Sequence, residues 1–434
     1  MPHPLGRRGF LSRMAANTLL AGMAPSVALP RLLAESDDAP FAPSRDDPDA
    51  RVFAAARRRF LFPTNVTYGN TGTLGASPRE VMDAFLHGLQ TLEHDLPDWP
   101  YFQADGEPLT GYQPLTEFRA EAGSFINAPA EEIAFTQNAT MGMSFLANGL
   151  DLAAGDEVVT TDHEHSGGIG GWLLKAKRYG IVVKQVPLLT GVANGPDGVV
   201  ALFADAITPK TRVVMFSHIT SGLGILMPAA QLCALARERG ALAIIDGAQA
   251  VGQIRVDVKA LGCDAYVASP HKWLLAPKGT GLLYIRREVQ DRVWNTLASA
   301  GFDDQDAGAF RFMHFGTGSL PLVYGLRAAL RFINAIGMDR IERWDGMLAR
   351  RLREGLGSIP SATLSSPADP RFAAAITTFK VNGHTGRQLQ DALWQRKIRV
   401  RSQGDARGVR LSAHLYVSPA DIDRMLEVVA GLGV

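Results

Sequence analysis

The chain has 434 residues, enough for two or three domains and a substantial buried core. Its 44 basic and 43 acidic side chains nearly cancel, and no long basic stretch favours nucleic-acid binding. No apolar run reaches the roughly 18 residues of a membrane span, so we expect no stable membrane insertion. The two cysteines, Cys233 and Cys263, are too few for a disulfide framework and are expected to pack as small apolar side chains.

The N-terminus carries the features of an export signal. The run from Arg7 to Leu11 matches the twin-arginine pattern RRxFL, and a mildly apolar stretch follows. We therefore expect residues 1–34 to be a signal peptide, recognised by the twin-arginine export machinery, and the protein to be periplasmic or otherwise exported. Residues 35–48, rich in Asp and Pro, are expected to be a linker. A disordered basic leader is the alternative.

Helices and strands then alternate along the chain. A short helix over 49–60 precedes a Gly-rich turn from Tyr68 to Gly72 and a helix over 78–93. Residues 94–114 form a long loop rich in aromatic side chains, typical of a binding loop or of a contact with a partner. Short apolar runs predict the strands of a mostly parallel sheet with helices on both faces. These runs cover residues 131–136, 156–161, 212–216, 242–245, 264–268 and 282–286.

The ends of two of these strands carry residues suited to binding. Asn138, Ala139 and Thr140 open a helix directly after the first strand. Free backbone N–H groups at such a junction attract an anion, and Thr140 either adds a hydroxyl or caps the helix. His163 and His165 follow the second strand. Two such histidines can indicate a metal site, but no third ligand with suitable spacing follows them.

An acid and a lysine lie at two further strand ends. Asp246 ends the run 242–245, and Lys272 follows the run 264–268 within the segment Ser-Pro-His-Lys-Trp. In open α/β sheets, ligands bind at the carboxyl ends of strands. Pyridoxal phosphate needs a lysine for its attachment and a carboxylate facing its pyridinium nitrogen, and partial burial keeps the lysine neutral. Taken alone, Lys272 could equally be a surface lysine, and Asp246 could equally be a structural acid at a turn.

The string DGAQAVG, followed by SPHKW and a Gly-rich strand start, resembles the class V aminotransferase family. This family includes cysteine desulfurases and isopenicillin N epimerase, and the resemblance runs from about Tyr68 to the C-terminus. It implies the α/β fold of type I pyridoxal-phosphate transferases, with a smaller α+β C-terminal lobe. We accordingly expect a large cofactor-binding domain over 49–320 and a small domain over 321–434.

The resemblance also implies roles for individual residues. Lys272 would attach the cofactor and then act as the general base on Cα, Asp246 would face the pyridine nitrogen, and His165 would stack on the ring. Thr317 would reach the cofactor phosphate of a partner subunit, which implies a homodimer. The full set implied to bind the cofactor is Asn138, Ala139, Thr140, His165, Asp246, Gln249, Ser269, His271, Lys272 and Thr317.

Three further residues are implied to contact the substrate. Arg410, in an Arg-Leu-Ser motif, would bind the substrate carboxylate as a bidentate fork. Asn70 lies in a turn that resembles the epimerase-like branch, and His218 follows the strand 212–216. The alternatives are a solvated arginine, a plain helix-entry loop and a hydrogen-bonded structural histidine.

One departure from the family limits the chemistry. Cysteine desulfurases carry a nucleophilic cysteine in the loop before this arginine, whereas residues 401–408 contain none, which excludes desulfurase action by the usual route. We expect an exported, aminotransferase-like pyridoxal-phosphate enzyme that acts on an amino group beside a carboxylate, in an amino acid or a peptide side chain. It looks like the exported type that matures the peptide siderophore pyoverdine. The alternatives are an epimerase or lyase of the isopenicillin N epimerase type and a protein that binds the cofactor without turnover.

Overall fold

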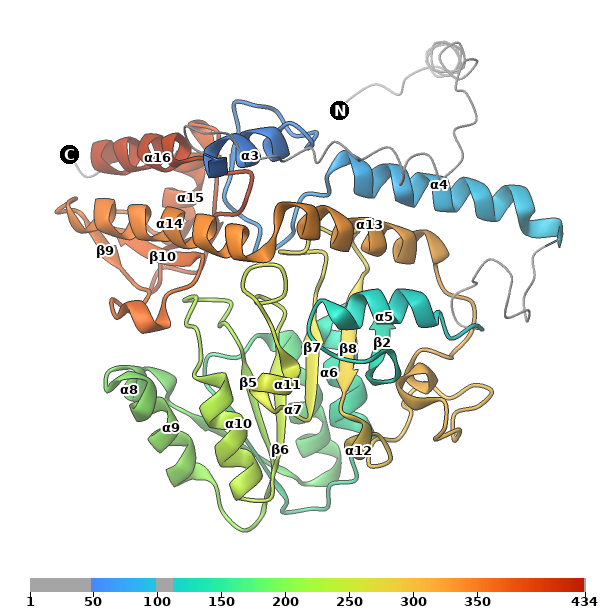
Figure 1. Ribbon diagram of the computed structural model, residues 1–434. Coiled ribbons are helices and arrows are strands. Elements are labelled where there is room, and N and C mark those ends of the chain that lie inside the picture. The colour runs from blue at the N-terminus through green and yellow to red at the C-terminus, as the bar shows by residue number, and fades with distance from the viewer. Residues whose placement is uncertain (1–47, 99–111, 433–434) are drawn as a thin grey trace, which may run out of the picture. The chain divides into compact units, whose positions relative to one another are not determined.

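The computed structural model describes residues 48–98 and 112–432. The expected signal peptide, nearly all of the linker and most of the aromatic loop lie outside these residues. The described elements pack as one unit (Figure 1), so the expected domain boundary between residues 320 and 321 stays a prediction. No helix within 48–98 or 112–432 is long and apolar enough to cross a membrane.

A seven-stranded sheet in the order β2-β8-β7-β6-β5-β3-β4 forms the centre of the fold (Figure 1). Strands β4, β3, β5, β6 and β7 run parallel to one another, whereas β8 is antiparallel to both of its neighbours, β2 and β7. The mostly parallel sheet expected from the sequence is thus confirmed. Its strands are β2 (Ile133–Thr136), β3 (Glu157–Thr161), β4 (Val182–Val186), β5 (Thr211–Ser217), β6 (Leu242–Asp246), β7 (Ala265–Ala268) and β8 (Gly281–Ile285).

The helices expected over 49–60 and 78–93 are confirmed as α3 and α4, with ends that differ from the predicted ones by a few residues. The N-terminal helices are α3 (Pro48–Arg57), α4 (Arg79–Asp95), α5 (Thr116–Ser124), α6 (Ala139–Gly149) and α7 (Ser166–Tyr179). Those between the next strands are α8 (Leu188–Val192), α9 (Gly195–Ala206), α10 (Ala229–Glu238), α11 (Val258–Leu261) and α12 (Arg287–Gln290). The last are α13 (Leu320–Ile336), α14 (Met338–Gly357), α15 (Gly386–Gln395) and α16 (Pro419–Leu432).

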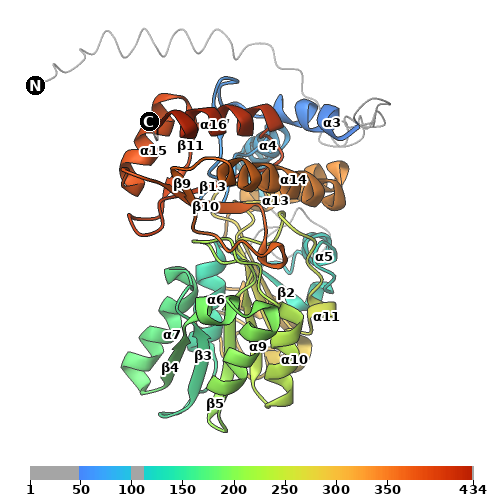
Figure 2. The same ribbon diagram turned by 90° about the vertical axis from the view of Figure 1, so that its left-hand side faces the viewer.

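Helices cover both faces of the large sheet, which explains why central strands such as β6, with the sequence LAIID, are almost entirely apolar. Side chains of successive strand residues point to opposite faces. Val213 and Met215 therefore join the core that contains Trp172 of α7, whereas Phe216 meets Phe203 of α9, with ring centroids 6.2 Å apart. Figure 2 shows α7 on one side of the sheet and α9 and α10 on the other.

The C-terminal part contains a four-stranded antiparallel sheet in the order β12-β13-β10-β9, which confirms the expected α+β lobe. Its strands are β9 (Ala362–Leu364), β10 (Ile376–Val381), β12 (Arg401–Ser402) and β13 (Val409–Ser412). The sequence of this lobe predicts one continuous strand over 398–402, and this prediction is wrong, because the chain changes partners within it. Ile398–Arg399 forms β11, which pairs with β1 (Thr67–Tyr68), and only β12 joins the small sheet.

The turn after β1 is bound to the C-terminal lobe and to the large sheet. The hydroxyl of Thr71 lies 2.5 Å from that of Tyr416, and Asn70 pairs with Ser412 in an isolated bridge. The side-chain amide of Gln249 donates to the carbonyl of Gly72 over 2.9 Å. These contacts bring the N-terminal turn next to the ends of β6 and β13.

The packing of α9 on the sheet can be tested at Phe203, whose side chain is fully buried. We expect Phe203→Ala to lower the free energy of unfolding by about 3–5 kcal/mol, because it leaves a cavity in a close-packed core. Urea denaturation followed by circular dichroism measures the change. Phe302→Ala, which removes a ring that is 45% exposed, should alter stability by no more than about 0.5 kcal/mol. Equal effects of the two variants would contradict this packing.

Candidate active site

A cavity of about 330 Å³ lies where β6 and β7 end and where α6 and α7 begin. It brings together all of the predicted site residues except Asn70, His218 and Thr317. Its lining consists of Gly72, Thr73, Asn138, Ala139, Thr140, His165, Ser221, Asp246, Ala248, Gln249, Ser269, His271, Lys272, Arg401, Gln403 and Arg410. Residues from the N-terminal turn, the large sheet and the small sheet therefore meet in one place.

Asp246 is held rigidly at the end of β6. Its side chain is 5% exposed, and its Oδ1 accepts a hydrogen bond of 2.9 Å from the backbone N–H of Ala248. The start of α7 approaches the other oxygen so closely that a Cβ on Gly168 would lie 2.7 Å from Oδ2. Glycine at this position lets the acid face the cavity with a fixed orientation.

Lys272 lies in the turn after β7, and its amine is adapted to be neutral. Burial lowers the pKa of Lys272 to about 8, an effect that Asp246 opposes and that Arg410 and Arg401 reinforce. Because deprotonation yields the neutral amine, about half of the lysine is a nucleophile at pH 8, and more of it at higher pH. The buried side chains of Trp273, Leu274 and Leu275 follow it directly in the chain.

The start of α6 and the turn after β7 form an end of the cavity suited to an anion. Asn138 caps the helix by accepting from the N–H of Met141 over 2.9 Å, and the N–H of Ala139 donates to the hydroxyl of Ser269 over 3.1 Å. His271 donates its Nδ1–H to the carbonyl of Thr280 over 2.9 Å, since a carbonyl can only accept. The N-terminus of α6, the hydroxyls of Thr140 and Ser269 and the imidazole of His271 fit a phosphate group.

His165 and its neighbour Glu164 lie at the start of α7. The Nδ1 atom of His165 accepts from the N–H of Gly167 over 3.0 Å, so the neutral ring carries its proton on Nε2. Glu164 was not predicted from the sequence. It accepts hydrogen bonds from Thr161 and Ser217, and desolvation raises its pKa to about 7. Among the described residues, no group of three or more His, Cys, Asp or Glu side chains could hold a metal ion.

Two arginines share the opposite end of the cavity. Arg410 is 3% exposed and donates to the carbonyl of Ser221 over 2.7 Å and to the hydroxyl of Thr73 over 2.8 Å. Arg401 donates to the same hydroxyl over 3.0 Å and stands directly opposite Arg410 in the β12–β13 ladder. Neither arginine forms an ion pair with a carboxylate of the described chain. Like charges in register are unfavourable, so this pair fits an anionic ligand.

The lining contains residues that sequence reasoning missed, notably Thr73, Arg401 and Gln403. The two hydrogen-bonded partners Arg401 and Thr73 are 328 residues apart, so no local pattern links them. The available signal was that Arg401 and Arg410 lie on two consecutive strands, β12 and β13, whose register places them directly opposite each other.

Asn70 and His218 lie beside the cavity rather than in its lining. The Oδ1 of Asn70 is 3.5 Å from a guanidinium nitrogen of Arg410, so it borders the arginine end. The ring of His218 is buried, with Nδ1 2.9 Å from the hydroxyl of Tyr266, and burial lowers its pKa to about 4. The contacts of His218 are those of the structural alternative, and its substrate role stays a prediction.

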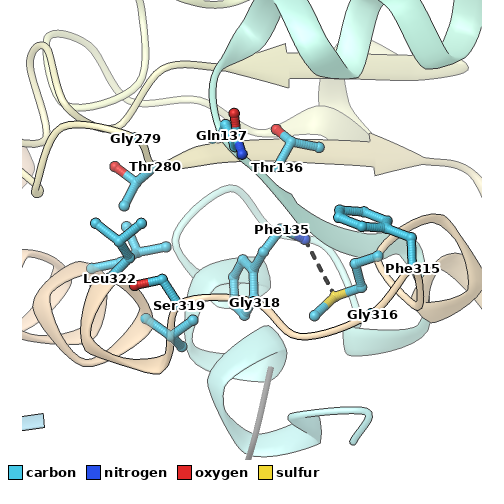
Figure 3. A pocket seen from close by; sticks show the side chains of 14 residues that line it. Phe135, Thr136, Gln137, Gly279, Thr280, Phe315, Gly316, Gly318, Ser319 and Leu322 are labelled. Atoms are coloured by element: carbon cyan, nitrogen blue, oxygen red, sulfur yellow. Dashed lines mark hydrogen bonds between the residues drawn. The ribbon is translucent and has the colours of Figure 1, made fainter. Parts of the chain in front are cut away.

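Thr317 lies away from this cavity, beside a second one of about 130 Å³. Figure 3 shows Thr280, Ser319 and Leu322 at one end of the second cavity and Phe315 at the other. The hydroxyl of Thr317 lies 3.1 Å from that of Tyr112. The two cavities adjoin through Thr280, whose carbonyl accepts the hydrogen bond from His271.

Comparisons with known proteins agree with this geometry. Residues 110–425 match the family described as Aminotransferase class-V. Isopenicillin N epimerase from Amycolatopsis lactamdurans is 30% identical over 88% of this chain and 99% of its own length. A cysteine desulfurase from Salmonella agona (strain SL483) is 30% identical over 73% of this chain and 81% of its own.

Solved structures with the same fold include the cystine C-S lyase C-DES in complex with its product cysteine persulfide. A mutant of C-DES with glycine covalently linked to its PLP cofactor matches 86% of this chain and 98% of its own, at 25% identity and a TM-score of 0.77. In this chain, Lys272, Asp246 and the anion site at α6 fit the same cofactor in one cavity. The cofactor is thus pyridoxal phosphate, and the chain belongs to the class V aminotransferase family of pyridoxal-phosphate enzymes.

Proposed function

We propose that the protein is an exported transaminase that acts on a primary amine beside a carboxylate, in an amino acid or in a side chain of a peptide such as a maturing siderophore. The observation that carries this proposal is that Lys272, Asp246 and the buried Arg410 line one cavity. The first two suit the cofactor, and the third is a buried cation that has no acidic partner in the described chain. A carboxylate next to the reacting amine supplies the missing charge.

The residues of the chain divide the work between three tasks. When bound, pyridoxal phosphate withdraws electrons from the carbon that bears the substrate amine. Asp246 keeps the pyridine nitrogen protonated, which maintains that withdrawal. The neutral amine of Lys272 takes the proton from this carbon and returns one, acting as general base and then general acid. Arg410, supported by Thr73, orients the carboxylate, and therefore selects which bond faces Lys272.

Epimerisation is the second candidate, supported by the near full-length match to isopenicillin N epimerase. Both reactions begin with the same proton transfer to Lys272. They differ in where the proton is returned: to a different atom in transamination, and to the opposite face of the same carbon in epimerisation. The product therefore distinguishes them, whereas the cavity serves both.

Export and dimerisation belong to the proposal as well. The twin-arginine pattern supports export, because that route carries proteins already folded around their cofactors. The position of Thr317 outside the first cavity is consistent with a homodimer in which Thr317 serves the partner's cofactor site.

The reaction can be identified by incubating the purified holoenzyme in D₂O with amino acids and short peptides that carry a free amine beside a carboxylate. Transamination converts the amine to a carbonyl while an added 2-oxo acid gains an equal amount of amine. Epimerisation instead inverts the configuration of the reacting carbon and leaves one deuterium on it. We expect Lys272→Ala to lower either rate at least a hundred-fold, because it removes the general base. If no amine gives either product or exchanges its hydrogen for deuterium, the proposed enzymatic function is wrong and the protein binds the cofactor without turnover.

Arg410 and Arg401 can be tested by steady-state kinetics. Arg410→Ala should raise the Michaelis constant for a carboxylate substrate roughly ten- to hundred-fold, the value of a charged hydrogen bond worth about 1.5–3 kcal/mol. Arg401→Ala should have a smaller effect in the same direction, since Arg401 is more exposed. Arg399→Ala is the matched control, because its guanidinium lies over the ring of Trp394, outside the cavity. An equal loss with an amine that lacks a carboxylate would contradict the role of Arg410.

Export can be tested by replacing Arg7 and Arg8 together with lysine. The twin-arginine machinery reads the paired guanidinium groups, so the variant should remain in the cytoplasm, folded and loaded with cofactor. Arg13→Lys changes the same leader outside the motif and should be exported normally. Fractionation followed by immunoblotting measures the distribution. Periplasmic accumulation of the double variant at the normal level would refute this route.

A further inference from the structure

A buried histidine and a buried aspartate lie directly behind the lysine segment, and the mechanism above uses neither. The imidazole of His414 is 0% exposed and the side chain of Asp345, on α14, is 1% exposed. Nδ1 of His414 lies 2.7 Å from Oδ2 of Asp345, and Nε2 lies 2.8 Å from the backbone carbonyl of Trp273. Trp273 is the residue next to Lys272, so the pair contacts the backbone that carries the reactive amine.

The partners of His414 determine where its protons lie. A backbone carbonyl can only accept a hydrogen bond, so Nε2 carries a proton and donates to Trp273. Nδ1 then meets Asp345 either as a donor to its carboxylate or as an acceptor from its carboxylic acid. In both cases, Asp345 fixes the plane of the ring and keeps Nε2–H pointing at the Trp273 carbonyl.

The side chain of Trp273 extends this network to the cofactor-binding residues. Its indole N–H donates to Oε1 of Gln249 over 2.8 Å, and Gln249 donates in turn to the carbonyl of Gly72. The ring of Trp273 also contacts that of His414 edge-on, with centroids 5.2 Å apart. Trp273 is thus held at its carbonyl by His414 and at its indole by Gln249, with Lys272 immediately before it.

A purely structural role does not account for such a pair. Replacing a buried charged pair by apolar residues is often neutral or stabilising, because both groups lose their hydration. Here the cost is increased by Oδ1 of Asp345, which is buried and has no hydrogen-bond partner among the described residues. A buried pair with this energetic cost fits a role in orienting a neighbouring group, here the peptide group of Trp273.

We infer that His414, oriented by Asp345, is a positioning residue that holds the Trp273 peptide and thereby fixes where the amine of Lys272 lies in the cavity. His414 follows β13, the strand that supplies Arg410, so one short segment positions both the carboxylate site and the lysine. The inference rests on the proposed attachment of the cofactor to Lys272. It does not depend on which reaction follows.

Four variants test this role. His414→Phe keeps a ring in place but removes the hydrogen bond to Trp273, whereas the amide of His414→Gln can restore that bond. Asp345→Asn keeps the shape of the carboxyl and removes its charge. Trp344→Phe is the matched control, because it removes a buried hydrogen bond of 3.1 Å from α14 to another backbone carbonyl, that of Val417.

Two measurements report on Lys272 without requiring turnover. The first is the pH at which Lys272 of the apoprotein is half-labelled by an amine-reactive reagent, read by peptide mass spectrometry. The second is the half-life of the bound cofactor when the holoenzyme is diluted into buffer with a cofactor scavenger. In the wild type, we expect half-labelling near pH 8, because burial lowers the pKa of Lys272 to about 8.

We expect His414→Phe to raise the labelling midpoint above pH 8, because a loosened segment lets water reach the amine and restores the charged form. It should also shorten the cofactor half-life about ten-fold relative to Trp344→Phe, as expected for one lost buried hydrogen bond. His414→Gln should recover the cofactor half-life to within about three-fold of the wild-type value and return the labelling midpoint to near pH 8. Asp345→Asn should shift the labelling midpoint and the cofactor half-life in the same direction as His414→Phe, but by smaller amounts.

The role is refuted if His414→Phe matches Trp344→Phe in both measurements while the two variants lose equal stability. It is also refuted if a stably folded His414→Gln is as impaired as His414→Phe. Where His414→Phe fails to fold, wild-type values for Asp345→Asn reject the inference. Failure of the proposed function is a separate outcome: the holoenzyme then converts no amine, while the two measurements still shift with His414.

Discussion

The site depends on keeping one buried lysine neutral. Lowering the pKa of Lys272 from 10.5 to about 8 destabilises its charged form relative to the neutral amine by roughly 3–4 kcal/mol. Asp246 attracts the ammonium and works against this, so burial has to outweigh a nearby acid. The same acid must remain ionised for the cofactor ring. The fold reconciles both needs by placing the two residues after separate strands, Asp246 at the end of β6 and Lys272 in the turn after β7.

Charge balance in the cavity follows from this arrangement. Asp246 is the carboxylate of the lining, whereas Arg401 and Arg410 stand opposite each other across two strands. Two guanidinium groups in register repel one another, and the burial of Arg410 lowers its pKa to about 10. The anionic substrate proposed above would relieve both costs on binding. In that proposal, the fold retains an unfavourable pair of charges that becomes favourable only when the substrate is bound.

The parts of the site that the sequence predicted are those formed within one strand-turn unit. Asp246 and Lys272 follow their own strands, so the rule about strand ends, together with the resemblance of the strings DGAQAVG and SPHKW to a known family, was enough to bring them together. The reversal of β8 had a usable signal too, because the short segment between β7 and β8 contains the lysine turn and no helix to cross over. Arg401 with Thr73 and His414 with Asp345 depend on contacts between residues 328 and 69 apart, which periodicity does not report.

The likeness to cysteine desulfurases does not extend to a cysteine in the cavity. A persulfide forms on a thiolate, yet no cysteine lines the cavity. Both cysteines are buried as expected, Cys233 on α10 and Cys263 before β7. Burial raises the pKa of Cys233 to about 12 and that of Cys263 well above its usual value, so both remain protonated and unreactive. In place of a thiol, the function proposed above uses proton transfer by Lys272 and binding of a carboxylate by Arg410, which transamination and epimerisation both require.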